Sequence, residues 1–208
     1  SAWSAAAQEP LTNISQIRSL SGEQRIKNLP VKLDAVVTYY HLGWGVLFVH
    51  DGKDGICVGV PTEQRNKDFA PGTKLHVEGV AGPGEFLPVV LPSVLEERGT
   101  GDLPQAERVS AEQLFEPALD CHPVEVQAIV KGTWFSDDSL VVDLQIDGWS
   151  VKAIVPQQQA RTQLPWQLLE RRMRVRGVAG THFNDQRQMS GRLLFVPGLE
   201  SFVVDEEA

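Results

Sequence analysis

The sequence has few cysteines and no long apolar run. Its 208 residues include two cysteines, Cys57 and Cys121, which lie far apart in the chain and form no CxxC pair. This spacing excludes the usual zinc and thioredoxin signatures. One disulfide, which would need an oxidising compartment, and two separate buried thiols both stay open. No stretch of about 18 apolar residues occurs, so we expect no segment of this sequence to span a membrane.

The sequence also lacks the motifs of common catalytic and cofactor sites. It contains no nucleophile elbow and no phosphate-binding loop. The five histidines are scattered, and none has a second His or Cys at metal-site spacing. Gly82-Pro83-Gly84 is interpreted as a turn, because no helix start follows it. We therefore expect this chain to have no enzymatic activity, no metal and no cofactor.

The sequence has fewer positively charged than negatively charged residues. The net charge is −8, with 27 acidic residues against 19 Lys and Arg. Binding to a polyphosphate backbone requires Lys and Arg to replace condensed counterions, so the charge argues against nucleic acid as a partner. The second half of the chain is more basic along its strands, for which a solvated strand face is the favoured explanation. These residues are Lys131, Lys152, Arg161, Arg171, Arg172, Arg174 and Arg176.

What the sequence does contain is an internal repeat. Lys74–Gly82 reads KLHVEGVAG, and Arg172–Gly180 reads RMRVRGVAG. Pro123–Val130 likewise aligns with Pro30–Val37. Each block holds five strand-like segments of alternating polarity, with a connector or helix between the third and the fourth, which is the order of an OB-fold. The sequence predicts an all-β protein with short helices, built as two tandem OB-like five-stranded barrels; a pair of small β-sandwiches is the alternative.

Local signals set the expected boundaries. Ser21–Gln24 and Ser110–Gln113 each fit a capping box, and we interpret them as corresponding leader helices. The fifth strand of the first block is expected at Leu87–Leu91, and residues 157–170 are predicted as a helix with Pro165 in its first turn. The predicted parts are a signal-peptide remnant or flexible tail at 1–10, with cleavage after Ala7, a first domain at 11–98, a linker at 99–109 and a second domain at 110–204.

Aromatic residues supply the candidate binding site. In OB barrels, strands two and three and the loop between strands one and two form the usual ligand face. Rings at such a face can stack on bases, sugars or a partner side chain, or they can plug the barrel ends. Strand alternation predicts that Tyr39 points into the barrel, whereas Tyr40 and Trp44 are more available to contact a ligand. The candidate ligand-binding residues are Tyr40, Trp44, Phe48, Trp134 and Phe135.

Three segments of the first block carry a family resemblance. Pro30–Tyr40, Leu47–Val58 and Pro71–Val90, preceded by Leu11–Ser21, resemble the N-terminal extracytoplasmic region of certain bacterial sensor histidine kinases. The resemblance extends over roughly residues 11–200 and is looser in the second block. It implies an exported region with OB-like domains, followed in that family by a membrane span and a cytoplasmic kinase. No ligand residues carry over from the family.

The resemblance implies a non-catalytic sensory or interaction module of a membrane-anchored signalling protein. Such a module would lie on the periplasmic or extracellular side of the inner membrane and bind an unknown small molecule or protein. It could also dimerise through its parent receptor. Ligand binding is expected to shift the packing of the two barrels about a hinge at Glu97–Glu107. Two alternatives stay open, a single-stranded nucleic-acid-binding OB-fold protein and a structural spacer.

Overall fold

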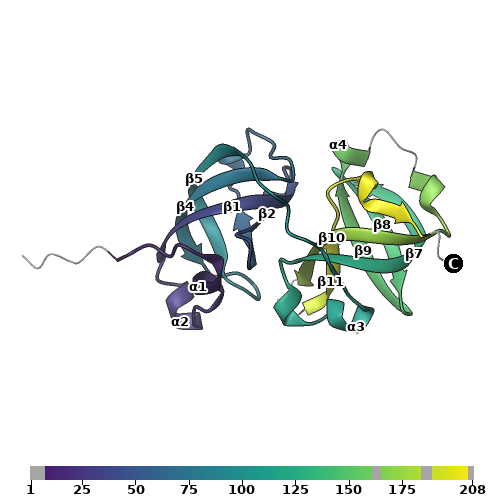
Figure 1. The fold of residues 1–208 in the computed structure, drawn as a ribbon, viewed down its shortest axis with the longest axis horizontal. Helices are drawn as coiled ribbons and strands as arrows, with labels where there is room; N and C mark the ends of the chain where they lie inside the picture. The colour runs from purple at the N-terminus through teal and green to yellow at the C-terminus, as the bar shows by residue number, and fades with distance from the viewer. Residues whose placement is uncertain (1–7, 161–164, 184–188, 206–208) are drawn as a thin grey trace, which may run out of the picture.

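The chain forms two β-barrels side by side. A computed structural model describes residues 8–160, 165–183 and 189–205. The strands of the first barrel lie within residues 30–100 and those of the second within residues 107–204, joined by an extended segment at 101–106 (Figure 1). Among the described residues, no helix is long and apolar enough to cross a membrane. The proposed cleavage-site region, residues 1–7, lies outside the described residues.

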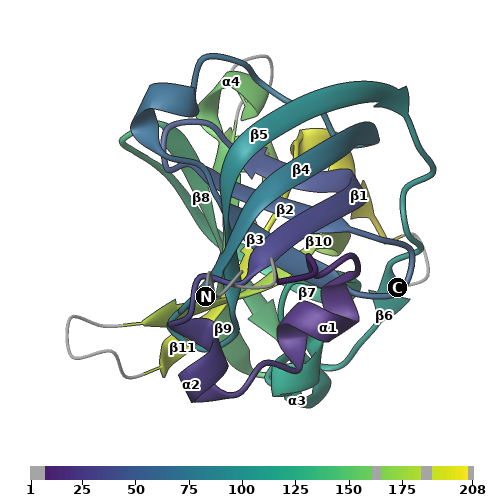
Figure 2. The same cartoon turned by 90° about the vertical axis from the view of Figure 1, so that its left-hand side faces the viewer.

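The first barrel is a closed ring of strands in the order β1-β2-β3-β5-β4. The long first strand pairs with the second along one part of its length and with the fourth along another, and a parallel pairing between the third and fifth strands completes the ring. Figure 2 shows β1, β4 and β5 curving across one side of this barrel. The strands are β1 (Pro30–His41), β2 (Val46–His50), β3 (Gly55–Gly59), β4 (Thr73–Gly82) and β5 (Val89–Thr100).

The second barrel repeats this ring. Its sheet runs β12-β10-β11-β9-β8-β7-β6, and an additional β10–β7 pairing closes five of these strands. The third and fifth strands of the ring again pair in parallel. The prediction of two tandem five-stranded barrels is confirmed. The strands are β6 (Glu107–Arg108), β7 (Pro123–Ser136), β8 (Ser139–Ile146), β9 (Trp149–Pro156), β10 (Arg172–Phe183), β11 (Met189–Phe195) and β12 (Phe202–Val204).

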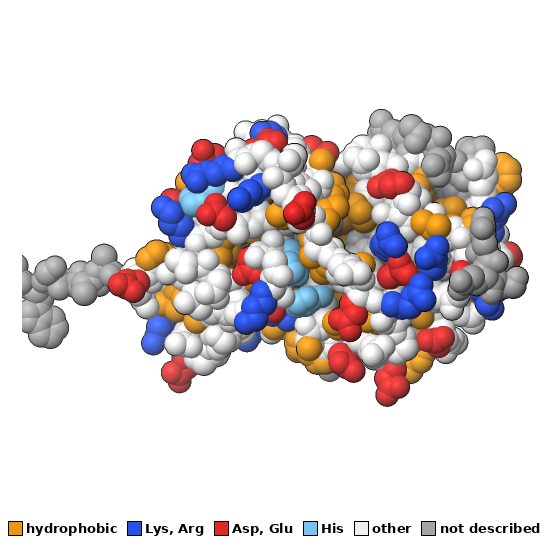
Figure 3. All heavy atoms as spheres, in the orientation of Figure 1, with side chains coloured by type: hydrophobic (Ala, Val, Ile, Leu, Met, Phe, Trp, Pro, Cys, Tyr) orange, Lys and Arg blue, Asp and Glu red, His pale blue; other side chains and the backbone are white. Residues whose placement is uncertain are grey.

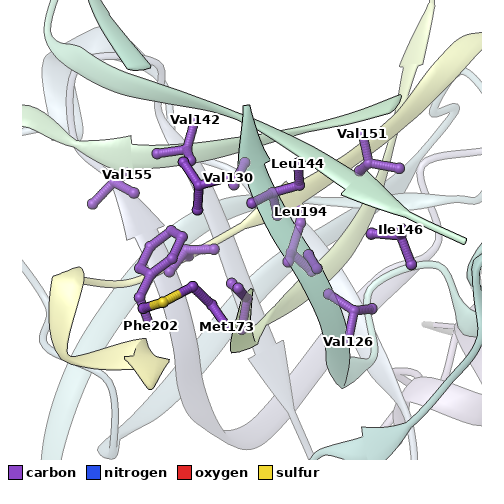
Figure 4. Packing of buried hydrophobic residues seen from close by; sticks show 14 of the residues in the cluster. Val126, Val130, Val142, Leu144, Ile146, Val151, Val155, Met173, Leu194 and Phe202 are labelled. Carbon is purple, nitrogen blue, oxygen red and sulfur yellow. The ribbon is translucent and has the colours of Figure 1, made fainter. Parts of the chain in front are cut away.

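Alternation along the strands builds each barrel core. On β7, Val126 and Val130 point into the second barrel, whereas Gln127 between them is exposed. Figure 4 shows Val126 and Val130 converging with Met173, Leu194 and other residues from the surrounding strands. Burying one such aliphatic side chain contributes about 1.5–3 kcal/mol, so each barrel has its own source of stability.

Short capped helices precede each barrel. They are α1 (Ile14–Arg18), α2 (Gly22–Arg25) and α3 (Ala111–Leu114). Each begins with a reciprocal capping box, in which the cap side chain accepts from the backbone N–H three residues on. The capping boxes predicted at Ser21–Gln24 and Ser110–Gln113 therefore located the starts of α2 and α3.

The helix α3 corresponds to α1 and not to α2. The N–H of Ile14 donates to the Asp51 carboxylate in the β2–β3 turn at 2.8 Å. The N–H of Ala111 donates to the Asp147 carboxylate in the β8–β9 turn at 3.2 Å. Both helices bury two apolar residues, whereas α2 buries none. The interpretation that Ser21–Gln24 matches Ser110–Gln113 is wrong, because a capping box marks a helix start but not the face that packs.

Two other boundaries differ from expectation. β5 runs to Thr100, far beyond the expected end at Leu91, because β4 offers a long edge with which it pairs through Pro92 at a register shift. In the predicted helix at 157–170 the structure describes two short pieces, and residues 161–164 lie outside the described part. The remaining helical segments are η1 (Thr62–Gln64), η2 (Pro117–Leu119), α4 (Gln157–Ala160), η3 (Pro165–Leu168) and η4 (Leu199–Ser201).

A third apolar cluster joins the two barrels. Tyr39 and Phe48 of the first barrel pack on Phe195 of the second, with ring centroids 5.2 and 5.0 Å apart. Val141 and Ile154 on the outer face of β8 and β9 complete this buried contact. An interface of this apolar kind resists relative domain movement. It argues against the expected hinge at 97–107, of which residues 97–100 are in any case part of β5.

Polar contacts reinforce the same interface. The Arg18 guanidinium, on α1, donates to the carbonyl oxygens of Ala118 and Asp120 in the second barrel at 3.2 and 2.9 Å. Both cysteines lie in this interfacial cluster and are free thiols. Burial raises the pKa of the Cys57 thiol to about 12, so this thiol is held in its unreactive protonated form.

Candidate nucleic-acid interface

The first hairpins of the two barrels meet at their tips. His41, at the end of β1, lies with its imidazole Nε2 2.7 Å from the Ser139 hydroxyl at the start of β8. The Asp138 carboxylate, in the β7–β8 turn, lies 3.9 Å from the same nitrogen. A Cβ on Gly43 would come 1.6 Å from that carboxylate, so the two turns are in direct contact. The loops between strands one and two thus form one surface.

Trp44 is held on this surface by its own turn. Its indole stacks on the His41 ring with centroids 4.3 Å apart and planes 18° apart. The Arg65 guanidinium donates to the carbonyl oxygens of Gly43 and Val60 at 2.7 and 2.9 Å, which fixes the turn to the end of β3. One face of the Trp44 ring is therefore covered, yet the residue remains 40% exposed.

Trp134 and Phe135 project from the last part of β7. They pair in register with Val141 and Leu140 of β8. They are 41% and 49% exposed, although Val141 and Leu140 are buried. The Lys152 ammonium lies 5.8 Å from the centroid of the Trp134 ring. The two rings project from opposite faces of β7, because Val141 belongs to the interfacial cluster and Leu140 to the core of the second barrel. We call the region of the two hairpin tips that carries Trp44, Trp134 and Phe135 the hairpin junction.

Burial sets the charge state of this surface. Burial lowers the pKa of His41, and the nearby Asp138 carboxylate only partly opposes this effect. The backbone N–H of Trp44 donates to His41 Nδ1 at 3.1 Å, so Nδ1 is the acceptor and Nε2 carries the proton that is directed at Ser139. A neutral, fixed imidazole makes the junction a rigid stacking surface and not an acid–base site.

Two of the expected ligand-binding residues are not on this surface. A register shift between Val37 and Tyr39 lets β1 bulge at Thr38. The bulge reverses the alternation, so Tyr40 points into the first barrel and packs on Phe69, while Tyr39 points outward. Strand alternation alone had predicted the opposite for both tyrosines.

Phe48 is buried for a different reason. It lies on the outer face of β2, but the second barrel covers that face. Tyr40 and Phe48 are each only 4% exposed, so neither is accessible to a ligand in this fold. The ligand roles of Trp44, Trp134 and Phe135 stay predictions.

Sequence reasoning missed a cluster of arginines around Glu125. Arg108 and Arg176 both donate to this buried carboxylate, from β6 and β10. The alternation of Arg172, Arg174 and Arg176 along β10 was a visible signal, but it could not show that a groove lies beside them. Among the described residues, no group of three His, Cys, Asp or Glu is placed to hold a metal ion.

Comparison with known proteins gave structural matches only. No family model and no curated protein matches this chain. The chain is similar to the p204 HINb domain (TM-score 0.35, 10% identity, covering 78% of this chain and 90% of that one). It is also similar to the tetrameric p202 HIN2 (TM-score 0.32, 12% identity, 79% and 86%). A third match is a murine DNA-binding protein bound with double-stranded DNA (TM-score 0.37, 14% identity, 86% and 96%).

One expectation is corrected here. The net charge had argued against nucleic acid as a partner, but a protein similar to this chain over most of its length is bound with DNA. Net charge is a sum over the whole surface and does not exclude a local site. At these TM-scores the likeness by itself assigns no ligand, so the case for one must come from the side chains.

Proposed function

We propose that this chain binds single-stranded nucleic acid at the hairpin junction. The observation that carries the proposal is the exposure of Trp44, Trp134 and Phe135 on two hairpins that the fold brings into contact. Neighbouring strand residues project from opposite faces, so Trp134 and Phe135 offer rings on both faces of their hairpin, and large exposed rings grouped in one region often mark a contact site. Unstacked bases are suitable partners, because every base offers a π-face and stacking tolerates any sequence.

Nearby groups favour a single strand whose bases are exposed. Lys152, close to the Trp134 ring, supplies a cation for a neighbouring phosphate. Base–aromatic stacking contributes about 1–3 kcal/mol per base, so two or three rings suffice for micromolar affinity when phosphate contacts are added. A duplex keeps its bases paired and stacked and offers none of these ring faces.

The acidic residues at the tip set the conditions for binding. Asp137 and Asp138 occupy the β7–β8 turn beside the rings, and the whole chain carries a charge of −8. At low salt, these carboxylates repel phosphate over a long range, which limits the affinity. At high salt, the attraction between Lys152 and phosphate is screened, which lowers the affinity further. The proposal therefore predicts moderate affinity that weakens as salt increases.

Fluorescence anisotropy with a labelled single strand of about 12 nucleotides tests the proposal. Trp134→Ala should weaken binding by roughly tenfold, the loss of one stacked base. Trp149→Ala is the matched control, because Trp149 is 55% exposed but pairs with Ile146, at the end of β8 opposite to the β7–β8 turn. Absence of saturable binding by the unmodified chain at low salt would refute the proposal.

A second candidate function is the sensory region of an exported receptor. It is supported by the resemblance of Pro30–Tyr40, Leu47–Val58 and Pro71–Val90 to the extracytoplasmic region of sensor histidine kinases. Sequencing the complete coding region tests it. A membrane span and a kinase domain downstream of residue 208 are expected, and a reading frame without them would remove this candidate.

A further inference from the structure

A groove runs between the two barrels on the side of the connecting segment. It has a volume of about 1120 Å³. The segment's residues Leu103 and Pro104 line it together with Thr38 of β1 and Val178 of β10. Figure 3 shows Lys and Arg side chains gathered over the second barrel beside this hollow. The cations that line the groove are Arg108, Arg174 and Arg176, and we call it the arginine groove.

A buried carboxylate holds two of these arginines in place. Glu125, which is 7% exposed, accepts from Arg108 Nη2 at 3.1 Å and from Arg176 Nε at 2.6 Å. Burial alone raises the pKa of Glu125, but the hydrogen bonds from Arg176 and Arg108 outweigh it and lower the pKa overall. Arg176 uses only Nε in this contact, so its two terminal amino groups remain available to a bidentate anion.

The third arginine has an unused donor. Arg174 Nε is buried, and within the described part of the chain it has no hydrogen-bond partner. An unpartnered buried donor costs free energy, which a ligand that accepts a hydrogen bond from it would recover. Arg172, two residues earlier on β10, is exposed and continues the same outward row.

We propose that the arginine groove takes the phosphate groups of the bound nucleic acid, with Arg174 and Arg176 as the phosphate contacts. This inference rests on the proposed function. The strand pairing supports it, because the arginine row of β10 lies beside β7, and β7 continues to Trp134. A single strand that stacks on Trp134 can follow β7 back to the row.

The acidic residues of the groove limit which anions fit. Glu107, Glu125 and Glu200 line the same groove, and Asp205 accepts a hydrogen bond from Gln127 nearby. Small free anions gain little from a groove whose lining carries as many carboxylates as guanidinium groups. A polymer that also contacts the apolar lining, Leu103 and Val203, gains more. The site is therefore suited to a phosphodiester chain and not to inorganic phosphate.

Salt-dependent binding of two single-stranded probes tests this assignment. One is a labelled oligothymidine of about 12 nucleotides, and the other is an abasic strand of the same length. Arg174→Gln and Arg176→Gln should each reduce the slope of log affinity against log salt by about 0.7 and should weaken binding of both probes. Trp134→Ala should weaken only the probe that has bases.

Arg98→Gln is the matched control, since it removes one positive charge from β5, outside the groove lining. Its slope and affinity should match those of the unmodified chain. If the arginine variants bind oligothymidine with an unchanged slope while Trp134→Ala weakens it, the phosphate assignment is wrong and the proposed function stands. If the unmodified chain binds neither probe, both fail.

Discussion

The imidazole Nε2 of His41, in the first barrel, donates to the hydroxyl oxygen of Ser139, in the second, across 2.7 Å. Both residues are almost fully buried, at 1% and 0% exposure. A buried polar pair between two barrels fixes their relative orientation, because sliding either barrel leaves both groups without partners. The Trp44 ring stacks on the same imidazole, so the hairpin junction depends on this contact.

Ser139→Ala should destabilise the chain. The substitution leaves the Nε2–H of His41 buried without an acceptor, which costs about 1–3 kcal/mol. Urea denaturation measures the free energy of unfolding. Ser93→Ala is the control, because the Ser93 hydroxyl donates to the backbone carbonyl oxygen of Glu78 at an exposed site. Equal stability of the two variants would contradict a fixed junction.

Gly55→Ala should separate the barrels. A Cβ on Gly55 would lie 2.0 Å from the carbonyl oxygen of Cys121, which is backbone and cannot move aside on its own. Overpacking of this kind typically costs about 1–3 kcal/mol. Gly22→Ala meets nothing within 4 Å and serves as the control in thermal unfolding. If the Gly55→Ala chain unfolds at the same temperature as the Gly22→Ala control, the interface is not tightly packed.

Acid should weaken the interface through a histidine pair. The rings of His50 and His122 meet edge to face across it, with centroids 5.7 Å apart. Burial lowers the pKa of both histidines. The charge of Arg18 lowers the pKa of His122 further, whereas the Asp54 carboxylate raises the pKa of both and only partly offsets the effect of burial. Below about pH 6.5 the unfolded chain therefore binds protons that the folded chain does not, so stability falls as the pH drops.

The measurement is the free energy of unfolding between about pH 7 and pH 5. His122→Gln should reduce the loss on acidification, because one of the two lowered pKa values disappears. An identical pH profile for the variant and the unmodified chain would contradict the assignment.

His76 should act in the opposite direction. Hydrogen bonds to Asp34 and Glu78, at 2.9 and 3.1 Å, raise its pKa. Its stabilising contribution is complete below the unfolded pKa of about 6.5 and is lost as the pH rises through the higher folded value. His76→Gln should flatten the decline in stability on the alkaline side of pH 6.5. A variant that keeps the full decline would show that another group causes it.

The repeat and the alternation of polarity were enough to predict the two barrels. Pro30–Val37 and Pro123–Val130 begin equivalent strands, β1 and β7, and the ring order is the same in both barrels. Alternation failed where a single bulge intervened. At Thr38 it exchanged the directions of Tyr39 and Tyr40, and a bulge depends on how β1 pairs with β2, which no local pattern reports.

The candidate site was predictable only in part. Trp44, Trp134 and Phe135 are exposed, as expected for a ligand face. Phe48 follows the same pattern but is covered, because a pattern within one barrel carries no information on what packs against it. The Glu125 contacts were equally hidden, since β6 and β10 are far apart in sequence and are placed on either side of β7 only by the fold.

The central claim is that single-stranded nucleic acid lies across the hairpin junction. Its most direct test is photocrosslinking of the chain to a single strand that carries bromodeoxyuridine, followed by mass-spectrometric mapping of the crosslinked peptides. The account predicts crosslinks in the β7–β8 peptide that holds Trp134 and Phe135, and in the turn that holds Trp44. Crosslinks confined to other surfaces, such as the exposed Trp149 or Trp166, would contradict it.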